Sequence, residues 1–186
     1  MRLNEDDMRK RIPQLMAAAL FLSIASSLWA AERGPVYTTM GSVEVLGKAP
    51  HVILAGVGEF NTFNKGSTRS KAARAELKIG SKLAFVGPAI GVIAIEDDGG
   101  YAYAGIYAEL AWGRLLLTPL LATGVYRQGN DLDLGGSLEF RESLEIAYRL
   151  SERWRAGGSI GHISNGAIYE HNPGQHDFFV TVAAAF

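Results

Sequence analysis

Eight apolar stretches of about ten residues, separated by polar breaks, run from His51 to Phe186. Each stretch is rich in small, aromatic and β-branched residues, and glycines recur inside most of them, which favours strands over helices. Gly, Asn and Asp collect in the breaks, as they do in turns. The stretches cover residues 51–60, 71–80, 83–95, 101–112, 115–126, 136–149, 153–163 and 177–186. The sequence therefore predicts an all-β chain of eight antiparallel strands.

The breaks between these strands alternate in length. They are long after the first, third, fifth and seventh strands, and only two or three residues long after the second, fourth and sixth. Alternate connections of an antiparallel chain lie at the same end, so the long loops gather at one end and the short turns at the other. An even number of strands with this asymmetry is typical of a bacterial outer-membrane β-barrel.

The stretch 136–149 has one apolar face and one charged face. Its even positions are apolar apart from Glu142, and its odd positions carry most of the charges. A membrane barrel turns the apolar face outward, whereas a soluble lipid-binding barrel turns it inward, and the alternation alone allows both. Aromatic residues near the strand ends favour the membrane barrel; they are Trp112, Tyr148 and Trp154.

The N-terminal segment has the layout of a secretory signal peptide. Basic residues 9–11 precede an apolar run from Leu15 to Trp29, and Ala30 and Ala31 follow it. We expect a cleaved signal peptide over residues 1–31 and a single outer-membrane barrel domain over residues 32–186. Because acidic residues 5–7 and Pro13 are atypical of such a segment, an uncleaved membrane anchor is the alternative.

The composition excludes several classes of function. With 186 residues, a net charge of −1 and no cysteine, the chain offers neither a basic patch for nucleic acid nor a Cys/His set for structural zinc. Three histidines, His162, His171 and His176, could converge on a metal, but their spacing matches no strong signature. We expect no metal and no cofactor.

The candidate functional residues lie in the seventh predicted strand. His162 and Ser164 have the same parity as Trp154 and Ile160, so they share the apolar face. On the membrane interpretation they project toward lipid, at the strand end that enters a long loop. Two interfacial polar residues without a catalytic role are the simpler alternative.

The sequence around these residues resembles the lipid A 3-O-deacylase (PagL-type) family of outer-membrane enzymes. The similar motifs are His-Ile-Ser-Asn at 162–165, Asn-Pro-Gly at 172–174, Phe-Arg at 140–141 and Leu-Glu-Ile-Ala-Tyr-Arg at 144–149. The resemblance implies an eight-stranded barrel with Ser164 as nucleophile and His162 as general base, and it implies that Asn165 helps to hold the oxyanion. The implied partners are lipid A in the outer leaflet and, because strand 177–186 ends on the aromatic Phe186, the outer-membrane assembly machinery.

The family acid has no counterpart at its expected position. Two residues beyond the Asn-Pro-Gly motif, where the family has an acid, this chain has His176. Three replacements are open: Asp177, which parity places in the lumen, His176 itself, and Glu142. The hairpin between the sixth and seventh strands places Glu142 opposite either His162 or Ile160, depending on the register.

These observations predict an outer-membrane serine esterase that removes the ester-linked 3-position acyl chain from lipid A of lipopolysaccharide. Ser164 and His162 would act with Glu142 as the acid, or with His176 in the family acid position. The alternative is a noncatalytic barrel with a structural or surface-interaction role.

Overall fold

The computed structural model describes residues 35–63, 69–96 and 98–186, and within them the chain forms strands joined by turns and loops. The strands are β1 (Val36–Met40), β2 (Val43–Leu46), β3 (Val52–Phe60), β4 (Ser70–Lys78), β5 (Gly87–Ile95), β6 (Gly99–Tyr107), β7 (Leu110–Trp112), β8 (Leu115–Arg127), β9 (Leu138–Arg149), β10 (Trp154–Ser164) and β11 (Gln175–Ala185). Within these ranges no helix is long and apolar enough to cross a membrane. The predicted signal peptide, residues 1–31, lies outside the described residues.

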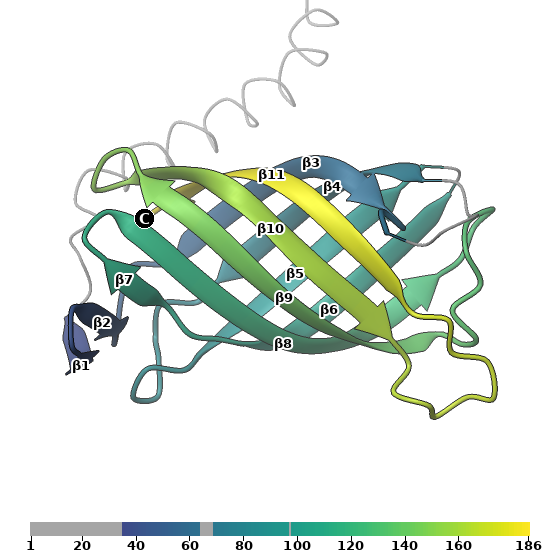
Figure 1. Ribbon diagram of the computed structural model, residues 1–186, viewed down its shortest axis with the longest axis horizontal. Coiled ribbons are helices and arrows are strands. Elements are labelled where there is room, and N and C mark those ends of the chain that lie inside the picture. Colours follow the sequence, from purple (N-terminus) through teal and green to yellow (C-terminus); the bar gives the residue numbers. More distant parts are fainter. Residues whose placement is uncertain (1–34, 64–68, 97) are drawn as a thin grey trace, which may run out of the picture.

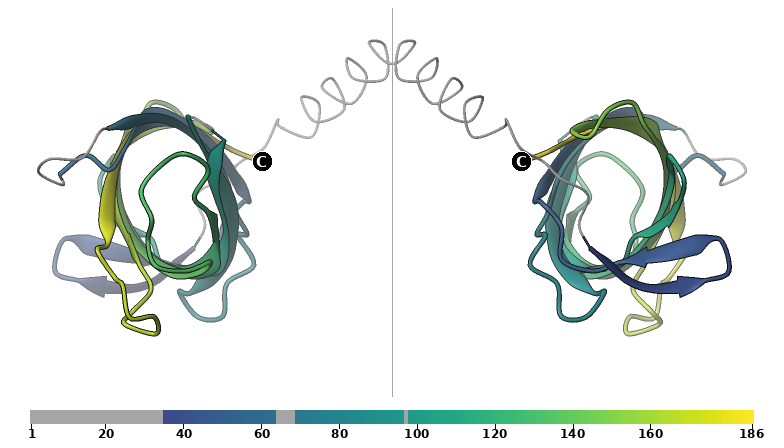
Figure 2. Two further views of the ribbon diagram at one scale, coloured as in Figure 1. Left: turned by 90° about the vertical axis from the view of Figure 1, so that its right-hand side faces the viewer. Right: turned by 90° about the vertical axis from the view of Figure 1, so that its left-hand side faces the viewer.

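Eight of the strands close into an antiparallel barrel. Neighbours pair in the order β3, β4, β5, β6, β8, β9, β10 and β11, and β11 pairs back onto β3. The strands tilt across the barrel wall (Figure 1), and the end-on views show a closed ring (Figure 2). A barrel leaves no unpaired strand edge, which is a requirement for crossing a membrane with strands. The predicted eight-stranded barrel is confirmed.

The connections differ in detail from the predicted alternation. Residues 79–86 and 108–114 join their strands at the turn end and are longer than expected, whereas β5 ends at Ile95 and β6 begins at Gly99, so the connection at the loop end is short there. The predicted strand 101–112 is divided into β6 and β7, because Glu109 turns inward between them and pairs with Lys82 and Arg155. The loops at 128–137 and 165–174 lie at the opposite end, as predicted, and β3 also ends there at Phe60 (Figure 1).

The barrel carries its apolar side chains outside and its charges inside. On β9, Phe140 and Ile146 are about half exposed, while Arg141 and Glu145 are buried. The other strands repeat this pattern, with large exposed residues such as Val57. An apolar exterior around a polar interior is the arrangement of a transmembrane barrel and the reverse of a soluble one.

Buried ion pairs fill the lumen. Lys78 Nζ lies 2.5 Å from Glu145 Oε2 and 3.2 Å from Glu76 Oε1, and Tyr103 donates to Glu76 Oε2 at 2.5 Å. Removing one member of such a network leaves a buried charge without its partner, at about 3–5 kcal/mol. The inward positions of the strands therefore hold the barrel together, and these are the even positions of β4 and the odd positions of β9. The outward positions, which are the even ones on β9 to β11, are left for other purposes.

The segment before the barrel forms a short hairpin, β1–β2, which extends through β7 to the turn end of β8. Leu46 N donates to Glu109 O and Ala49 N donates to Gly80 O. The hairpin therefore lies at the same end as the turns and the C-terminus (Figure 1).

Candidate active site

The outer face of β10 places His162 and Ser164 side by side, at the end of the strand that enters the loop 165–174. Both are partly buried, whereas Ile163 between them is fully buried in the lumen. Ile160, one step back on the outer face, is 51% exposed. The predicted outward direction of the pair is confirmed.

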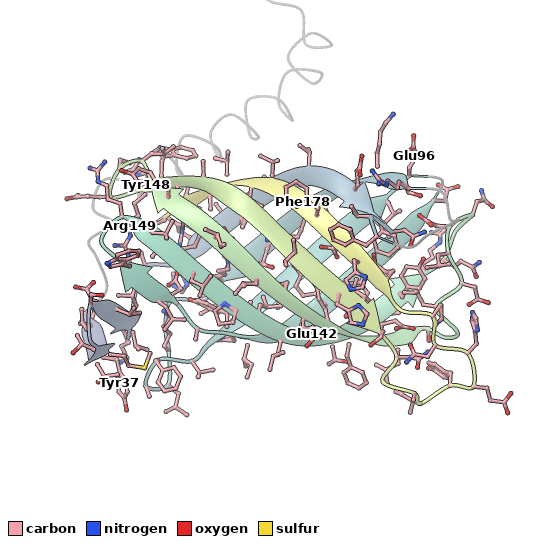
Figure 3. All side chains as sticks on the ribbon, viewed as in Figure 1. Tyr37, Glu96, Glu142, Tyr148, Arg149 and Phe178 are labelled. Atoms are coloured by element: carbon pink, nitrogen blue, oxygen red, sulfur yellow. The ribbon has the colours of Figure 1, made fainter. Side chains whose placement is uncertain are left out.

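The two neighbouring strands place a titratable side chain on either side of His162. Glu142 of β9 lies directly opposite it in one direction, and His176 of β11 lies directly opposite it in the other. The turn that fixes the first register brings Leu150 N to Trp154 O at 2.9 Å. Of the two registers that the sequence allows, the structure therefore has the one that pairs Glu142 with His162. Figure 3 shows Glu142 on the outer surface of the wall.

The His162 ring leans toward β11. Its centroid lies 4.6 Å from that of His176, with the ring planes tilted by 43°. A Cβ added to Gly174 would lie 2.8 Å from His162 Cε1 and 3.4 Å from Nε2, so the ring occupies the space that a side chain at Gly174 would fill. Gly174 has φ +61°, a conformation that also favours glycine.

Within the described residues, hydrogen bonds do not hold the two histidine rings at Nδ1. Among the described residues, Nδ1 of His162 and Nδ1 of His176 are buried and have no hydrogen-bond partner. On one strand face, side chains at i and i+2 lie roughly 6–7 Å apart, so Ser164 and His162 need a rotamer change to touch. Catalytic hydrogen bonds are often long before substrate binds and shorten in the complex.

Asp177 has a different partner, in the lumen. Its carboxylate accepts two hydrogen bonds from Arg141, one of them 3.0 Å between Nη2 and Oδ1, and both side chains are fully buried. Parity had placed Asp177 inside, and its bond to Arg141 fixes it there. Asp177 is therefore unsuited to orient His162, which lies on the opposite face of the wall.

Asn165 also points away from Ser164. Its Nδ2 donates to Leu134 O at 2.7 Å and to His171 O at 2.8 Å, and its Oδ1 accepts from Ala167 N at 3.0 Å. The expectation that its side-chain amide holds the oxyanion does not fit these contacts, because both amide hydrogens are already donated. Asn165 instead ties the loop that follows Ser164 to the loop that follows β8.

The sequence did not predict two residues that contact the site. Phe63, in the loop after β3, packs edge-on against His176 with centroids 5.8 Å apart. Its only signal is one aromatic residue in a polar loop. Gly174 closes the Asn-Pro-Gly motif, and its contact with His162 depends on the pairing of β10 with β11. Among the described residues, no group of three His, Asp or Glu side chains could hold a metal ion.

Comparison with known proteins identifies the family. The family model of "Lipid A 3-O-deacylase (PagL)" matches residues 62–183, more than half of the chain. The chain belongs to the PagL family. The match extends well before the motifs of residues 136–186, back to the loop after β3, and it includes every candidate site residue. No curated protein matches the chain.

Solved structures agree on the fold. The crystal structure of the outer membrane enzyme PagL has a TM-score of 0.56 at 14% identity and covers 73% of this chain and 99% of that one. The crystal structure of Neisserial surface protein A (NspA) has a TM-score of 0.51 at 12% identity and covers 73% and 97%. At these identities the likeness shows the barrel fold alone. With the PagL family and these outer-membrane neighbours, the protein is located in the bacterial outer membrane.

Proposed function

We propose that this protein is a serine esterase that removes the ester-linked 3-position acyl chain from lipid A of lipopolysaccharide. The PagL family supports the substrate and the reaction. The observation that carries the proposal is the cluster on the outer wall, where Ser164 and His162 share one face and Glu142 and His176 stand opposite His162. A serine, a base and a third group that orients the base are what acyl transfer requires.

In the proposed reaction, Ser164 Oγ attacks the carbonyl carbon of the ester while His162 accepts the hydroxyl proton. The tetrahedral intermediate collapses, the sugar oxygen leaves, and it takes the proton from His162. A water molecule, with His162 again as base, then hydrolyses the acyl-serine and releases the fatty acid. No metal or cofactor takes part in these steps.

Glu142 is our choice for the group that stabilises protonated His162. A carboxylate does this by charge, whereas a neutral imidazole such as that of His176 can offer only a hydrogen bond. Directly opposite residues of an antiparallel pair have Cα atoms about 4.5–5.5 Å apart, which lets Glu142 reach the ring once the ring turns toward β9. A carboxylate on the outer wall is tolerated because it lies near the loop end, where the membrane cost is about 0–1 kcal/mol.

Asn165 has an indirect role in this proposal. Its contacts with Leu134 and His171 order the turn after Ser164, in which Ile168 N donates to Asn165 O at 3.2 Å. The N–H groups of Asn165, Ala167 and Ile168 are donated within the loop, which leaves the backbone N–H of Gly166 to meet the developing oxyanion.

The surroundings suit an acyl-chain substrate. Phe140, Ile160 and Phe178 surround the cluster on the outer wall and are 46%, 51% and 41% exposed. Figure 3 shows Phe178 on the same outer surface as Glu142. Lipid A would reach this face by lateral diffusion in the outer leaflet, because the loop end of such a barrel faces the outside of the cell.

A noncatalytic barrel is the second candidate. His176 at the family acid position is the observation that favours it, and the fold itself also occurs in NspA, a surface protein by its title. On this interpretation, His162 and Ser164 remain from an active ancestor.

Mass spectrometry of lipid A separates the two. Cells that produce the protein should show lipid A lighter by one 3-hydroxyacyl group, and cells with Ser164→Ala should not. Ser159→Ala is the matched control, because Ser159 lies on the lumen face of the same strand and accepts a hydrogen bond from Arg74 at 3.1 Å. Unchanged lipid A in all three strains, with the barrel folded, would favour the noncatalytic candidate.

A further inference from the structure

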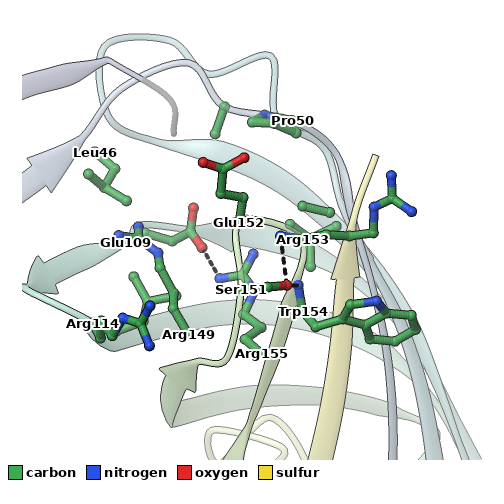
Figure 4. Close-up of a pocket in the computed structure, with 14 residues that line it drawn as sticks. Leu46, Pro50, Glu109, Arg114, Arg149, Ser151, Glu152, Arg153, Trp154 and Arg155 are labelled. Atoms are coloured by element: carbon green, nitrogen blue, oxygen red, sulfur yellow. Dashed lines mark hydrogen bonds and ion pairs between the residues drawn. The ribbon is translucent and has the colours of Figure 1, made fainter. Parts of the chain in front are cut away.

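A cavity of about 520 Å³ opens at the turn end of the barrel, far from the candidate active site (Figure 4). Its wall includes the four arginines Arg114, Arg149, Arg153 and Arg155, and apolar side chains such as those of Leu46 and Leu116. The volume lies within the range of about 300–1,000 Å³ for small-molecule sites. Arginines beside an aliphatic wall suit a ligand with both an anionic and an apolar part.

The charges around the cavity leave a positive excess. Two carboxylates, Glu109 and Glu152, face the four arginines. Glu109 Oε1 lies 2.5 Å from Arg155 Nη1 and its Oε2 lies 3.0 Å from Lys82 Nζ, so the charge of Glu109 is already compensated. Burial by itself would raise the pKa of Glu109, but Arg155 and Lys82 hold that pKa down to about 2.

Two of the other arginines, Arg114 and Arg149, lie at the mouth of the cavity. Arg114 is exposed and its guanidinium carbon lies 6.0 Å above the Tyr148 ring, and Arg149 is partly buried, with its backbone N donating to Arg114 O at 2.9 Å. Figure 4 shows the side chains of Arg114 and Arg149 close together, on the same side of the cavity as Glu109. Two guanidinium groups brought together in this way form a binding site for an oxyanion.

The cavity lies at the depth of lipid headgroups. Trp112, Tyr148 and Trp154 are 64%, 48% and 48% exposed at this end of the barrel, as in the aromatic girdle that marks a membrane interface. Trp154 itself lines the cavity. The turn end faces the periplasm, so the phosphodiesters of the inner leaflet of the outer membrane lie within reach.

We propose that this cavity binds the phosphate group of an anionic phospholipid from the periplasmic leaflet. Arg114 and Arg149 would hold the phosphate oxygens, and the aliphatic wall would cover the glycerol and the first carbons of the acyl chains. The site lies roughly 33 Å from Ser164, the length of β10, and does not depend on the proposed esterase function.

Native mass spectrometry of the purified protein in detergent tests the proposal. The wild type should retain one phosphatidylglycerol at least tenfold more tightly than phosphatidylcholine, and millimolar inorganic phosphate should compete with it. The double variant Arg114→Gln, Arg149→Gln should lose this preference. The control, Arg69→Gln with Arg127→Gln, removes two arginines at the loop end and should keep it.

Equal phosphatidylglycerol retention by the cavity variant and the loop variant would overturn the proposal. Inorganic phosphate binding that depends on the same arginines, without lipid retention, would keep the phosphate site and overturn its assignment to a lipid. If the double variant fails to give a heat-modifiable folded band, the single variant Arg114→Gln replaces it, because Arg114 is exposed. Retention should then fall at least threefold, and unchanged retention would overturn the proposal.

Discussion

Replacing Gly174 by alanine should disable the proposed active site without unfolding the barrel. The new Cβ would lie 2.8 Å from His162 Cε1, where carbon atoms need about 3.5–4.0 Å. The ring must therefore move by roughly 0.7–1.2 Å, toward β9 or away from the wall. A displacement of about 1 Å in a catalytic group can lower the rate roughly 100-fold, so we expect a loss of that size in kcat/KM.

The same substitution also strains the backbone, and this effect needs its own control. Alanine at φ +61° costs about 1–2 kcal/mol in the left-handed region. Gly113 has nearly the same φ, +59°, and a Cβ there would meet nothing within 4 Å. Gly113→Ala therefore carries the backbone strain alone.

The assay compares both variants with the wild type by urea unfolding and by release of 3-hydroxy fatty acid from lipid A in detergent. Both variants should lose similar stability, and only Gly174→Ala should lose activity. Equal activity in the two variants would show that the position of the His162 ring does not limit the reaction, which would refute its role as the base.

Three further predictions address the acid, the lumen and the turn end. His176→Glu, which places a carboxylate at the family acid position, should raise kcat. Glu142→Gln should lower kcat about tenfold or more. Full activity in Glu142→Gln would show that Glu142 does not take part in the mechanism. Asp177→Ala should destabilise the barrel by about 3–5 kcal/mol, because it leaves Arg141 charged and buried, and urea unfolding should detect this loss. Because the pKa of Glu109 is lowered from 4.5 to about 2, ionised Glu109 stabilises the fold above about pH 4.5, and this stability is lost as the pH falls toward 2. In urea unfolding, Glu109→Gln should therefore be less stable than the wild type at pH 7, and the difference should shrink by on the order of 3 kcal/mol by pH 2.

The side of the barrel wall that each strand residue faces could be predicted from the sequence, because it depends only on whether the position is odd or even along the strand. Alternation placed Glu142, His162 and Ser164 on one side and Asp177 on the other, and all four lie as predicted. The register between β9 and β10 was narrowed to two choices, since a one-residue slip would turn an apolar face inward.

Other features depend on contacts between distant residues, which no local pattern records. The break between β6 and β7 follows from the pairing of Glu109 with Lys82 and Arg155, each more than 25 residues away. The overlap of the His162 ring with Gly174 likewise depends on the path of the loop 165–174. The resemblance implied that Asn165 helps to hold the oxyanion, but its side-chain amide donates to Leu134 O and His171 O, 31 and 6 residues away, which no local pattern predicts.

The two faces of β10 have different roles: the lumen face stabilises the barrel, and the outward face carries the candidate active site. Arg155 and Ser159 hold the lumen through Glu109 and Arg74, whereas His162 and Ser164 contact no part of that network. The outward face can therefore change while the barrel persists, and for this reason a surface protein such as NspA can share the fold at 12% identity. The fold accordingly sets no requirement for catalysis, and the outward residues decide it. This chain has Ser164 and His162 on the outward face and His176 where the resemblance implies an acid. A measurement of the proposed esterase activity would therefore show how much the reaction depends on a carboxylate at position 176, with Glu142 on the strand at the other side of His162.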